Sequence, residues 1–243
     1  INVKGTRNVL EAANDQGVGR VVFTSTGGTL APGTLDQPAD EATPRQRGFY
    51  NLYEQTKYQS EQDIRDFAEQ GGDALTVNPT RVYGPGVLSI SNAATMLIQR
   101  YINGTWRFML GDGDSQGNFT YVKDVVEGHI LAMAHGRPGE RYILGGENMD
   151  LATYFQKIRE QSGKQYPLYK VPMAAAAAFA RLQKTKADIF KSPPVITPDW
   201  VAKYYQNWAC SSAKAQAELG YRITPANEAI AATIQWAREH QEA

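Results

Sequence analysis

The chain has 243 residues, and its 42% hydrophobic and 21% charged content is that of an ordinary globular protein, which excludes disorder. Its 25 basic residues balance 25 acidic ones, so the neutral chain is a poor partner for nucleic acid or an anionic membrane surface. No apolar run approaches the roughly 18 residues of a membrane span, and one cysteine with three scattered histidines argues against disulfides and against a metal site.

The first part of the chain alternates helix and strand patterns. Apolar residues at helical spacing predict a helix over 3–15, and a short β-rich run predicts a buried strand over 20–25. After a loop over 26–42, the pattern predicts a long helix over 50–69 and a second buried strand over 74–78. Such alternation with short joints favours parallel pairing. The predicted fold class is therefore α/β, a doubly wound parallel sheet with helices on both faces.

Beyond Pro85 the pattern becomes mostly helical. Helices are predicted over 92–103, 122–134, 151–162, 174–187, 212–219 and 225–242, with one strand over 141–144, a Gly- and aromatic-rich stretch over 106–121 and a proline-marked loop over 192–199. We predict two units. Residues 1–86, with 120–145 returning to them, form the unit with the parallel sheet, and 87–119 with 146–243 form a smaller, mostly helical module.

The strongest chemical signal is the pair Tyr53 and Lys57 on the long helix. Their spacing places both side chains on one face. A nearby ammonium favours the phenolate and lowers the pKa of a tyrosine from its usual value near 10, so such a pair can pass a proton to or from a substrate oxygen. The spacing alone is weak evidence. Tyr166 and Lys170 share it, but Pro167 between them argues against a helix there.

The strand ends strengthen this interpretation. The strand over 20–25 runs into hydroxyl residues and ends before Thr26, while the next strand leads into a Pro/Gly turn over 79–85. In an open parallel sheet, ligands bind beyond the carboxyl ends of the strands. We therefore expect Thr26, the Tyr53/Lys57 pair and this turn to meet in one crevice.

With these motifs in place, the chain resembles an extended short-chain dehydrogenase/reductase of the NAD-dependent epimerase/dehydratase and dihydroflavonol-reductase-like group. The matching stretches are residues 2–10, 22–26, 53–57, 79–85, 121–124 and 217–221, in family order. The resemblance implies an NAD(P)-dependent oxidoreductase or epimerase that acts on a carbonyl or hydroxyl of a small molecule or sugar derivative. NAD or NADP would carry the hydride. The resemblance also implies that residues 1–86, with 120–145, are the C-terminal part of an NAD(P)-binding Rossmann-like domain, and that 87–119 with 146–243 are the substrate-binding module.

The resemblance also implies roles for individual residues. Tyr53 would be the catalytic acid/base, Lys57 would lower its pKa and hold the nicotinamide ribose, and Thr26 would hydrogen-bond the substrate oxygen, with Ser25 as its neighbouring alternative. The residues expected near the cofactor are Asn2, Thr24, Ser25, Tyr53, Lys57, Pro79, Thr80, Arg81 and Val82. The residues expected near the substrate are Thr26, Tyr83, Arg107 and Asp124. For Asp124, a structural role as the cap of the following helix is the alternative.

Two features depart from the family pattern. No GxxGxxG turn occurs, so the backbone cradle that binds a pyrophosphate at a helix N-terminus is not in the sequence. The strands at the centre of such a sheet would be expected upstream of Ile1. Nucleotide-sugar members carry an arginine where this chain has Gly117 or Asn118. A bidentate arginine is hard to replace in phosphate recognition, which favours a small carbonyl or a different sugar derivative.

The alternatives are a non-catalytic protein that senses NAD(P) or binds a partner, and a truncated inactive fragment. Retention of both Tyr53 and Lys57 argues against the sensor. The resemblance further implies a homodimer that pairs through the helices over 4–14 and 50–69. The single cysteine, Cys210, fits a cytoplasmic location. The sequence leaves open NAD against NADP, the substrate, and the choice among reduction, epimerisation and dehydration.

Overall fold

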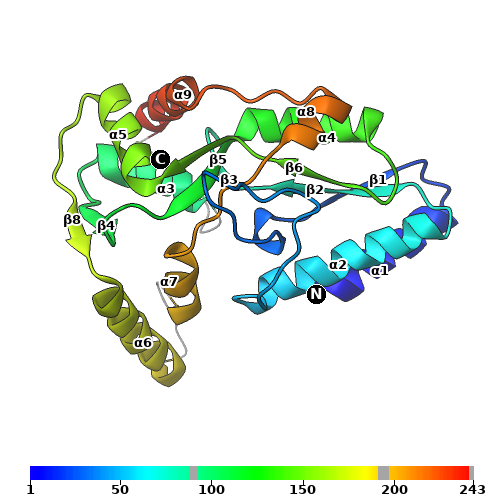
Figure 1. Ribbon diagram of the computed structural model, residues 1–243, viewed down its shortest axis with the longest axis horizontal. Coiled ribbons are helices and arrows are strands. Elements are labelled where there is room, and N and C mark those ends of the chain that lie inside the picture. Colours follow the sequence, from blue (N-terminus) through cyan, green and yellow to red (C-terminus); the bar gives the residue numbers. More distant parts are fainter. Residues whose placement is uncertain (88–91, 191–196, 241–243) are drawn as a thin grey trace.

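A computed structural model describes residues 1–87, 92–190 and 197–240. One end of the molecule holds a parallel sheet between helices, and the other holds a second group of helices and short strands (Figure 1). Within the described ranges, no helix is both long and apolar enough to cross a membrane. The same ranges contain no group of three or more side chains placed to hold a metal ion.

The first sheet has the strand order β1-β2-β6, and all its strands are parallel. The strands are β1 (Val21–Thr24), β2 (Ala74–Pro79) and β6 (Arg141–Leu144). On one face lie α1 (Asn2–Asp15) and α2 (Leu52–Glu69), and on the other lie α4 (Val122–His135) and α8 (Ala213–Leu219) (Figure 1). This arrangement confirms the predicted doubly wound parallel sheet.

Local chemistry explains the boundaries that position the site. Every residue of β2 is buried, as expected of a central parallel strand covered on both faces. The side chain of Asn51 accepts a hydrogen bond from the Glu54 amide and starts α2 at a defined point. Directly after β1 comes the short 3-10 helix η1 (Gly27–Thr29), capped by the Thr26 side chain.

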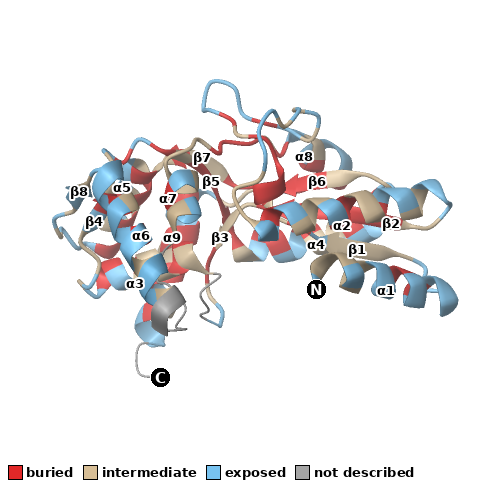
Figure 2. Ribbon diagram, turned by 90° about the horizontal axis from the view of Figure 1, so that it is seen from below, coloured by how far each residue is buried: buried red, intermediate tan, exposed pale blue. Residues whose placement is uncertain are grey.

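The second sheet has the order β3-β5-β7. Its strands are β3 (Arg81–Tyr83), β5 (Gln116–Tyr121) and β7 (Glu147–Asp150), and a separate parallel pair is formed by β4 (Phe108–Leu110) and β8 (Tyr169–Val171). The helices around them are α3 (Ala93–Ile102), α5 (Leu151–Ser162), α6 (Met173–Phe190), α7 (Pro198–Tyr204) and α9 (Ala226–Glu239). The core of this part is built around four buried aromatic side chains, Tyr83, Tyr101, Tyr154 and Phe155. Figure 2 shows buried residues gathered along the strands and exposed ones on the outer face of α1.

The prediction of a mostly helical second part was incomplete. The stretch 106–121 contains β4 and β5, and the predicted loop over 192–199 contains the start of α7; its residues 192–196 lie outside the described ranges. Strands of three residues, such as β3, β4 and β8, are too short to show an alternating pattern. Their pairing depends on partners far along the chain rather than on local sequence.

Candidate active site

Thr26 and Tyr53 meet at the carboxyl end of β1. The cap at Asn51 places Tyr53 in the first turn of α2, where its side chain is half exposed. Thr26 has extended backbone and accepts a hydrogen bond from the Gly28 amide at 3.2 Å. Burial raises the pKa of the Tyr53 phenol, and hydrogen bonding with the Thr26 side chain opposes that shift. The hydroxyls of Thr26 and Tyr53 are therefore neighbours.

Lys57 lies one turn further along α2, but it points to a different partner than expected. Its Nζ donates to the Thr24 carbonyl at 2.8 Å and lies 4.7 Å from the centre of the Phe23 ring. Burial lowers the pKa of Lys57. The groups that shift the Tyr53 pKa are its own burial, Thr26 and Glu54. Lys57 is not among the groups that shift the Tyr53 pKa in this structure, and its lowering of that pKa stays a prediction.

A buried carboxylate supports the turn behind Thr26. Glu61 Oε1 accepts hydrogen bonds from the Ser25 hydroxyl, from Thr29 Oγ1 at 2.7 Å and from Asn78 Nδ2 at 2.7 Å. Asn78 Nδ2 also lies 3.2 Å from the carbonyl oxygen of Thr26. Ser25, the alternative to Thr26, is therefore buried in this network, whereas Thr26 faces Tyr53.

A second buried carboxylate joins α2 to the C-terminal part of the chain. Glu54 is fully buried, and its Oε1 accepts a hydrogen bond from Lys203 of α7. Arg45 Nη2 lies 3.6 Å from the other oxygen of Glu54. Sequence analysis did not identify either carboxylate, because glutamates on a helix normally face solvent. The contact places α7 against the helix turn that carries Tyr53.

Other predicted cofactor residues lie along the same edge. Asn2 Nδ2 donates to Thr56 Oγ1 at 2.9 Å and so joins α1 to α2. Thr80, after the end of β2 at Pro79, donates its hydroxyl to Asn118 Oδ1 at 2.7 Å. His129, to which the sequence assigned no role, lies 2.9 Å from Thr24 Oγ1 through its Nε2.

The remaining predicted substrate residues have other partners, and within the described ranges no hydrogen bond, ion pair or ring contact joins them to Tyr53. Tyr83 is buried among aromatic rings in the core of the second part, and Val82 packs at the edge of the core under the first sheet. Arg107 lies over the Tyr166 ring at 3.9 Å. Asp124 accepts hydrogen bonds from the Thr224 amide and hydroxyl at 2.8 and 2.6 Å. It does not cap the helix that follows, because α4 begins after Tyr121 without a side-chain cap, so the alternative named for Asp124 is wrong in that detail.

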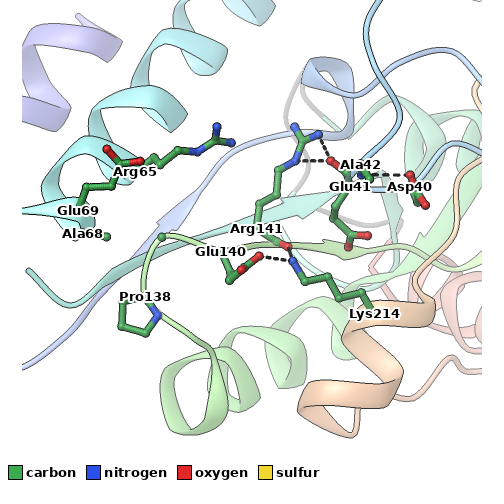
Figure 3. A pocket seen from close by; sticks show the side chains of 11 residues that line it. Asp40, Glu41, Ala42, Arg65, Ala68, Glu69, Pro138, Glu140, Arg141 and Lys214 are labelled. Carbon is green, nitrogen blue, oxygen red and sulfur yellow. Dashed lines mark hydrogen bonds and ion pairs between the residues drawn. The ribbon is translucent and has the colours of Figure 1, made fainter.

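A hollow of about 640 Å³ lies at the opposite end of the first sheet. It is lined by the end of α2, the loop over 40–42, the start of β6 and Lys214 of α8. Figure 3 shows two contacts among its side chains: Lys214 binds Glu140, and Arg141 donates to the Glu41 carbonyl. Ligands of open parallel sheets bind beyond the carboxyl ends of the strands, so this hollow is not the candidate active site.

Comparisons with known proteins agree with this geometry. The model of the NAD dependent epimerase/dehydratase family matches residues 1–145. The chain is 31% identical over 98% of its length to a putative dihydroflavonol 4-reductase of Synechocystis, of which it covers 70%. It is 27% identical over 97% of its length to the mouse sterol-4-alpha-carboxylate 3-dehydrogenase, decarboxylating, of which it covers 68%.

Solved structures show the same fold. The crystal structure of gox2253 is 31% identical, with a TM-score of 0.79, and the match covers 98% of this chain and 72% of that one. The UDP-glucose 4-epimerase of Thermus thermophilus in complex with NAD is 22% identical, with a TM-score of 0.75 over 99% of this chain and 70% of that one. Across the curated relatives, the chain spans between 56% and 72% of their length.

Proposed function

This chain belongs to the NAD-dependent epimerase/dehydratase family, and from that premise we propose that it is an NAD(P)-dependent oxidoreductase or epimerase. Its substrate would be the carbonyl or hydroxyl of a small molecule or sugar derivative. The observation that carries the proposal is the meeting of Thr26 and Tyr53 at the carboxyl end of β1, with Lys57 one turn along α2. Family relatives are named as reductases, dehydrogenases and epimerases.

Tyr53 would act as the proton donor or acceptor. Because burial raises its pKa, the phenol is protonated at neutral pH and can give a proton to a carbonyl oxygen as that oxygen gains negative charge. Thr26 would donate a second hydrogen bond and orient the same oxygen. The Glu61 network fixes the turn that carries Thr26, so the two donors are held in place before substrate binds.

The residues present fit the nicotinamide end of the cofactor. Lys57 has three N–H donors, and one of them is used on the Thr24 carbonyl, so two remain for ribose hydroxyls. When bound, the nicotinamide supplies or accepts the hydride. Among the described residues, no glycine-rich turn opens a helix, so those residues hold no family-type cradle for the pyrophosphate.

The test compares Tyr53→Phe with the matched control Tyr58→Phe on the same helix. Nicotinamide absorbance is followed with NADH or NADPH and a panel of ketones and oxo-sugars. We expect Tyr53→Phe to lower turnover about 100- to 10,000-fold, the usual contribution of a positioned acid, while cofactor binding and the Tyr58→Phe variant stay near wild type. Full turnover of Tyr53→Phe would contradict the proposal.

The same titration separates the alternative functions. Cofactor binding without turnover on any substrate would favour a protein that senses NAD(P). Neither binding nor turnover would favour a module whose catalytic residues are inactive. Cofactor binding together with turnover that depends on Tyr53 would exclude both the NAD(P)-sensing protein and the inactive module.

We also propose a homodimer that pairs through α1 and α2. The support is the exposed apolar surface of these helices, where Val9 is 59% and Leu52 is 73% exposed. Light scattering at micromolar concentration should give twice the mass of one chain, and a monomer would contradict the proposal. Cys210 as the single cysteine supports a cytoplasmic location, which cell fractionation would check.

A further inference from the structure

Arg81 is partly buried, and its guanidinium lies between two aromatic rings without an acidic partner among the described residues. Its Cζ lies 5.3 Å from the ring centres of both Phe119 and Tyr204. No ion pair or side-chain hydrogen bond joins it to any residue in the described parts of the chain. Burial lowers its pKa, and the ionisable groups acting on it are Tyr204, Tyr154 and Cys210, none of which is a carboxylate.

An unpaired guanidinium that is partly withdrawn from water is costly, because it loses part of its hydration and no acidic group compensates its charge. Contact with aromatic faces returns part of that cost, about 1–2 kcal/mol in a desolvated place. The other buried cations beside the candidate active site are arranged differently. Lys203 and Arg45 both lie against Glu54, so their charges are compensated.

The neighbouring strand leaves room for this guanidinium. A Cβ atom on Gly117 of β5 would lie 2.4 Å from Arg81 Nη1, so any larger residue at that position would displace the arginine. The side chain therefore lies flat on bare backbone. Gly117 is also a position where the family resemblance placed an arginine and this chain has none. The structure brings a guanidinium to that place from the adjacent strand β3.

Backbone contacts connect Arg81 to the candidate active site. Thr80, the preceding residue, packs against the loop after β1, where a Cβ on Gly27 would lie 3.2 Å from the Thr80 Cα. Gly27 directly follows Thr26 in the chain. Only Gly27 and Thr80, which pack against each other, therefore separate Arg81 from Thr26. Thr26 carries the hydroxyl that is proposed to hold the substrate oxygen.

Helix α7 connects the same two places from the other side. Tyr204, whose ring lies beside Arg81, follows Lys203 in α7. Lys203 binds Glu54, which follows Tyr53 in α2. Both connections lead from Arg81 to the segments that carry Thr26 and Tyr53.

We propose that Arg81 binds a negatively charged group of the substrate, so that the substrate is a carbonyl or alcohol bearing a carboxylate or a phosphate. The planar fork of arginine matches both groups in a bidentate manner. The proposal rests on the proposed function, since it assigns a substrate class to that site. The competing explanation is that Arg81 only packs between two rings.

The experiment measures binding of simple anions, without turnover. Inorganic phosphate and acetate are titrated separately into the purified chain, with potassium chloride at equal ionic strength as the reference. Tryptophan fluorescence is the readout, because the Trp200 ring lies 4.3 Å from the Tyr204 ring beside Arg81. The variants are Arg81→Met, Arg81→Lys and the matched control Arg107→Met, which removes another guanidinium that lies on a tyrosine ring. Thermal melts confirm that each variant is folded.

We expect saturable binding of at least one anion and at least about a tenfold loss of affinity in Arg81→Met, equivalent to about 1.4 kcal/mol. The anion affinity of Arg81→Lys should lie between those of wild type and Arg81→Met, because lysine keeps the positive charge but lacks the planar guanidinium. Arg107→Met should bind like wild type. A preference for phosphate or for acetate identifies which of the two groups the substrate carries.

Three results would overturn the proposal: equal affinity in Arg81→Met and wild type, loss of binding in Arg107→Met alone, or no saturable change with either anion. The outcome is independent of catalysis. Anion binding that depends on Arg81, together with full turnover of Tyr53→Phe, would contradict the proposed function and support the proposed anion site. Tyr53-dependent turnover without anion binding would do the reverse.

Discussion

Replacing Glu61 with alanine tests whether the buried network behind Thr26 holds the candidate site in place. Glu61 is 4% exposed, and among the described residues its Oε1 is the one acceptor of the Ser25 hydroxyl. Thr29 and Asn78 each keep another acceptor, the carbonyl of Thr26. Removing the carboxylate therefore orphans one buried hydroxyl, at about 1–3 kcal/mol. It also leaves a small cavity and removes the counter-charge of Arg141, 3.6 Å away.

We expect Glu61→Ala to lower the free energy of unfolding by about 3 kcal/mol, the lower end of the range for breaking a buried pair. Glu61→Gln keeps an acceptor at Oε1, so its loss should be about 1 kcal/mol. Urea unfolding at neutral pH, followed by circular dichroism and tryptophan fluorescence, measures both. Glu69→Ala is the control, because this exposed glutamate on the same helix should change stability by less than about 0.5 kcal/mol.

The reasoning would be refuted if Glu61→Ala unfolded within about 0.5 kcal/mol of wild type with an unchanged dependence on urea. That result would mean that the three donors find equivalent partners without the carboxylate. The turn over Thr26 would then be held by its backbone alone, and Glu61 would have no part in positioning Thr26.

Three further predictions concern protonation. Since burial raises the pKa of Tyr53, its phenol should ionise only above the usual value of about 10. Any folding stability that comes from the raised pKa is lost as the pH rises through the pKa of the folded protein. The difference between the ultraviolet titrations of wild type and Tyr53→Phe measures the pKa of Tyr53. Lys57→Met should leave that pKa nearly unchanged, because Lys57 binds the Thr24 carbonyl, and a rise of more than about one unit would contradict this geometry. Burial raises the pKa of the Cys210 thiol to about 12, so it should resist thiol reagents at mildly alkaline pH until the chain unfolds, and immediate labelling of folded protein would contradict its buried position.

The sequence was sufficient for those parts of the fold in which local pattern and tertiary structure agree. The fully buried run of β2 and the capped start of α2 both follow from short stretches of residues. β5 could not be predicted in this way. Its polar start is stabilised by Asn118, whose amide donates to Gly146 and Asn148 about 30 residues away, and such partners are not visible in a local window.

The same distinction applies to the candidate site. Thr26, Tyr53 and Lys57 could be predicted because each lies on an element with a strong local pattern. The position of Arg81 next to the end of a strand could be predicted from the sequence. Its surroundings could not, because the Tyr204 ring comes from α7, far along the chain. Whether the guanidinium is paired depends on residues from β5 and α7 that only the folded chain brings together.

Glu54 and Glu61 show what a sequence signal for such residues would be. They are seven residues apart, so they lie on one face of α2, and Ile64 continues that face into the core. A charged residue on the buried face of a helix needs a buried partner, because an unpaired charge there would destabilise the fold. Here the partners are Lys203, 149 residues away, and Asn78, 17 residues away. Acidic residues on the buried face of a helix next to a catalytic pair therefore indicate that other elements close on that helix, and the second part of the chain is the element that closes on Glu54.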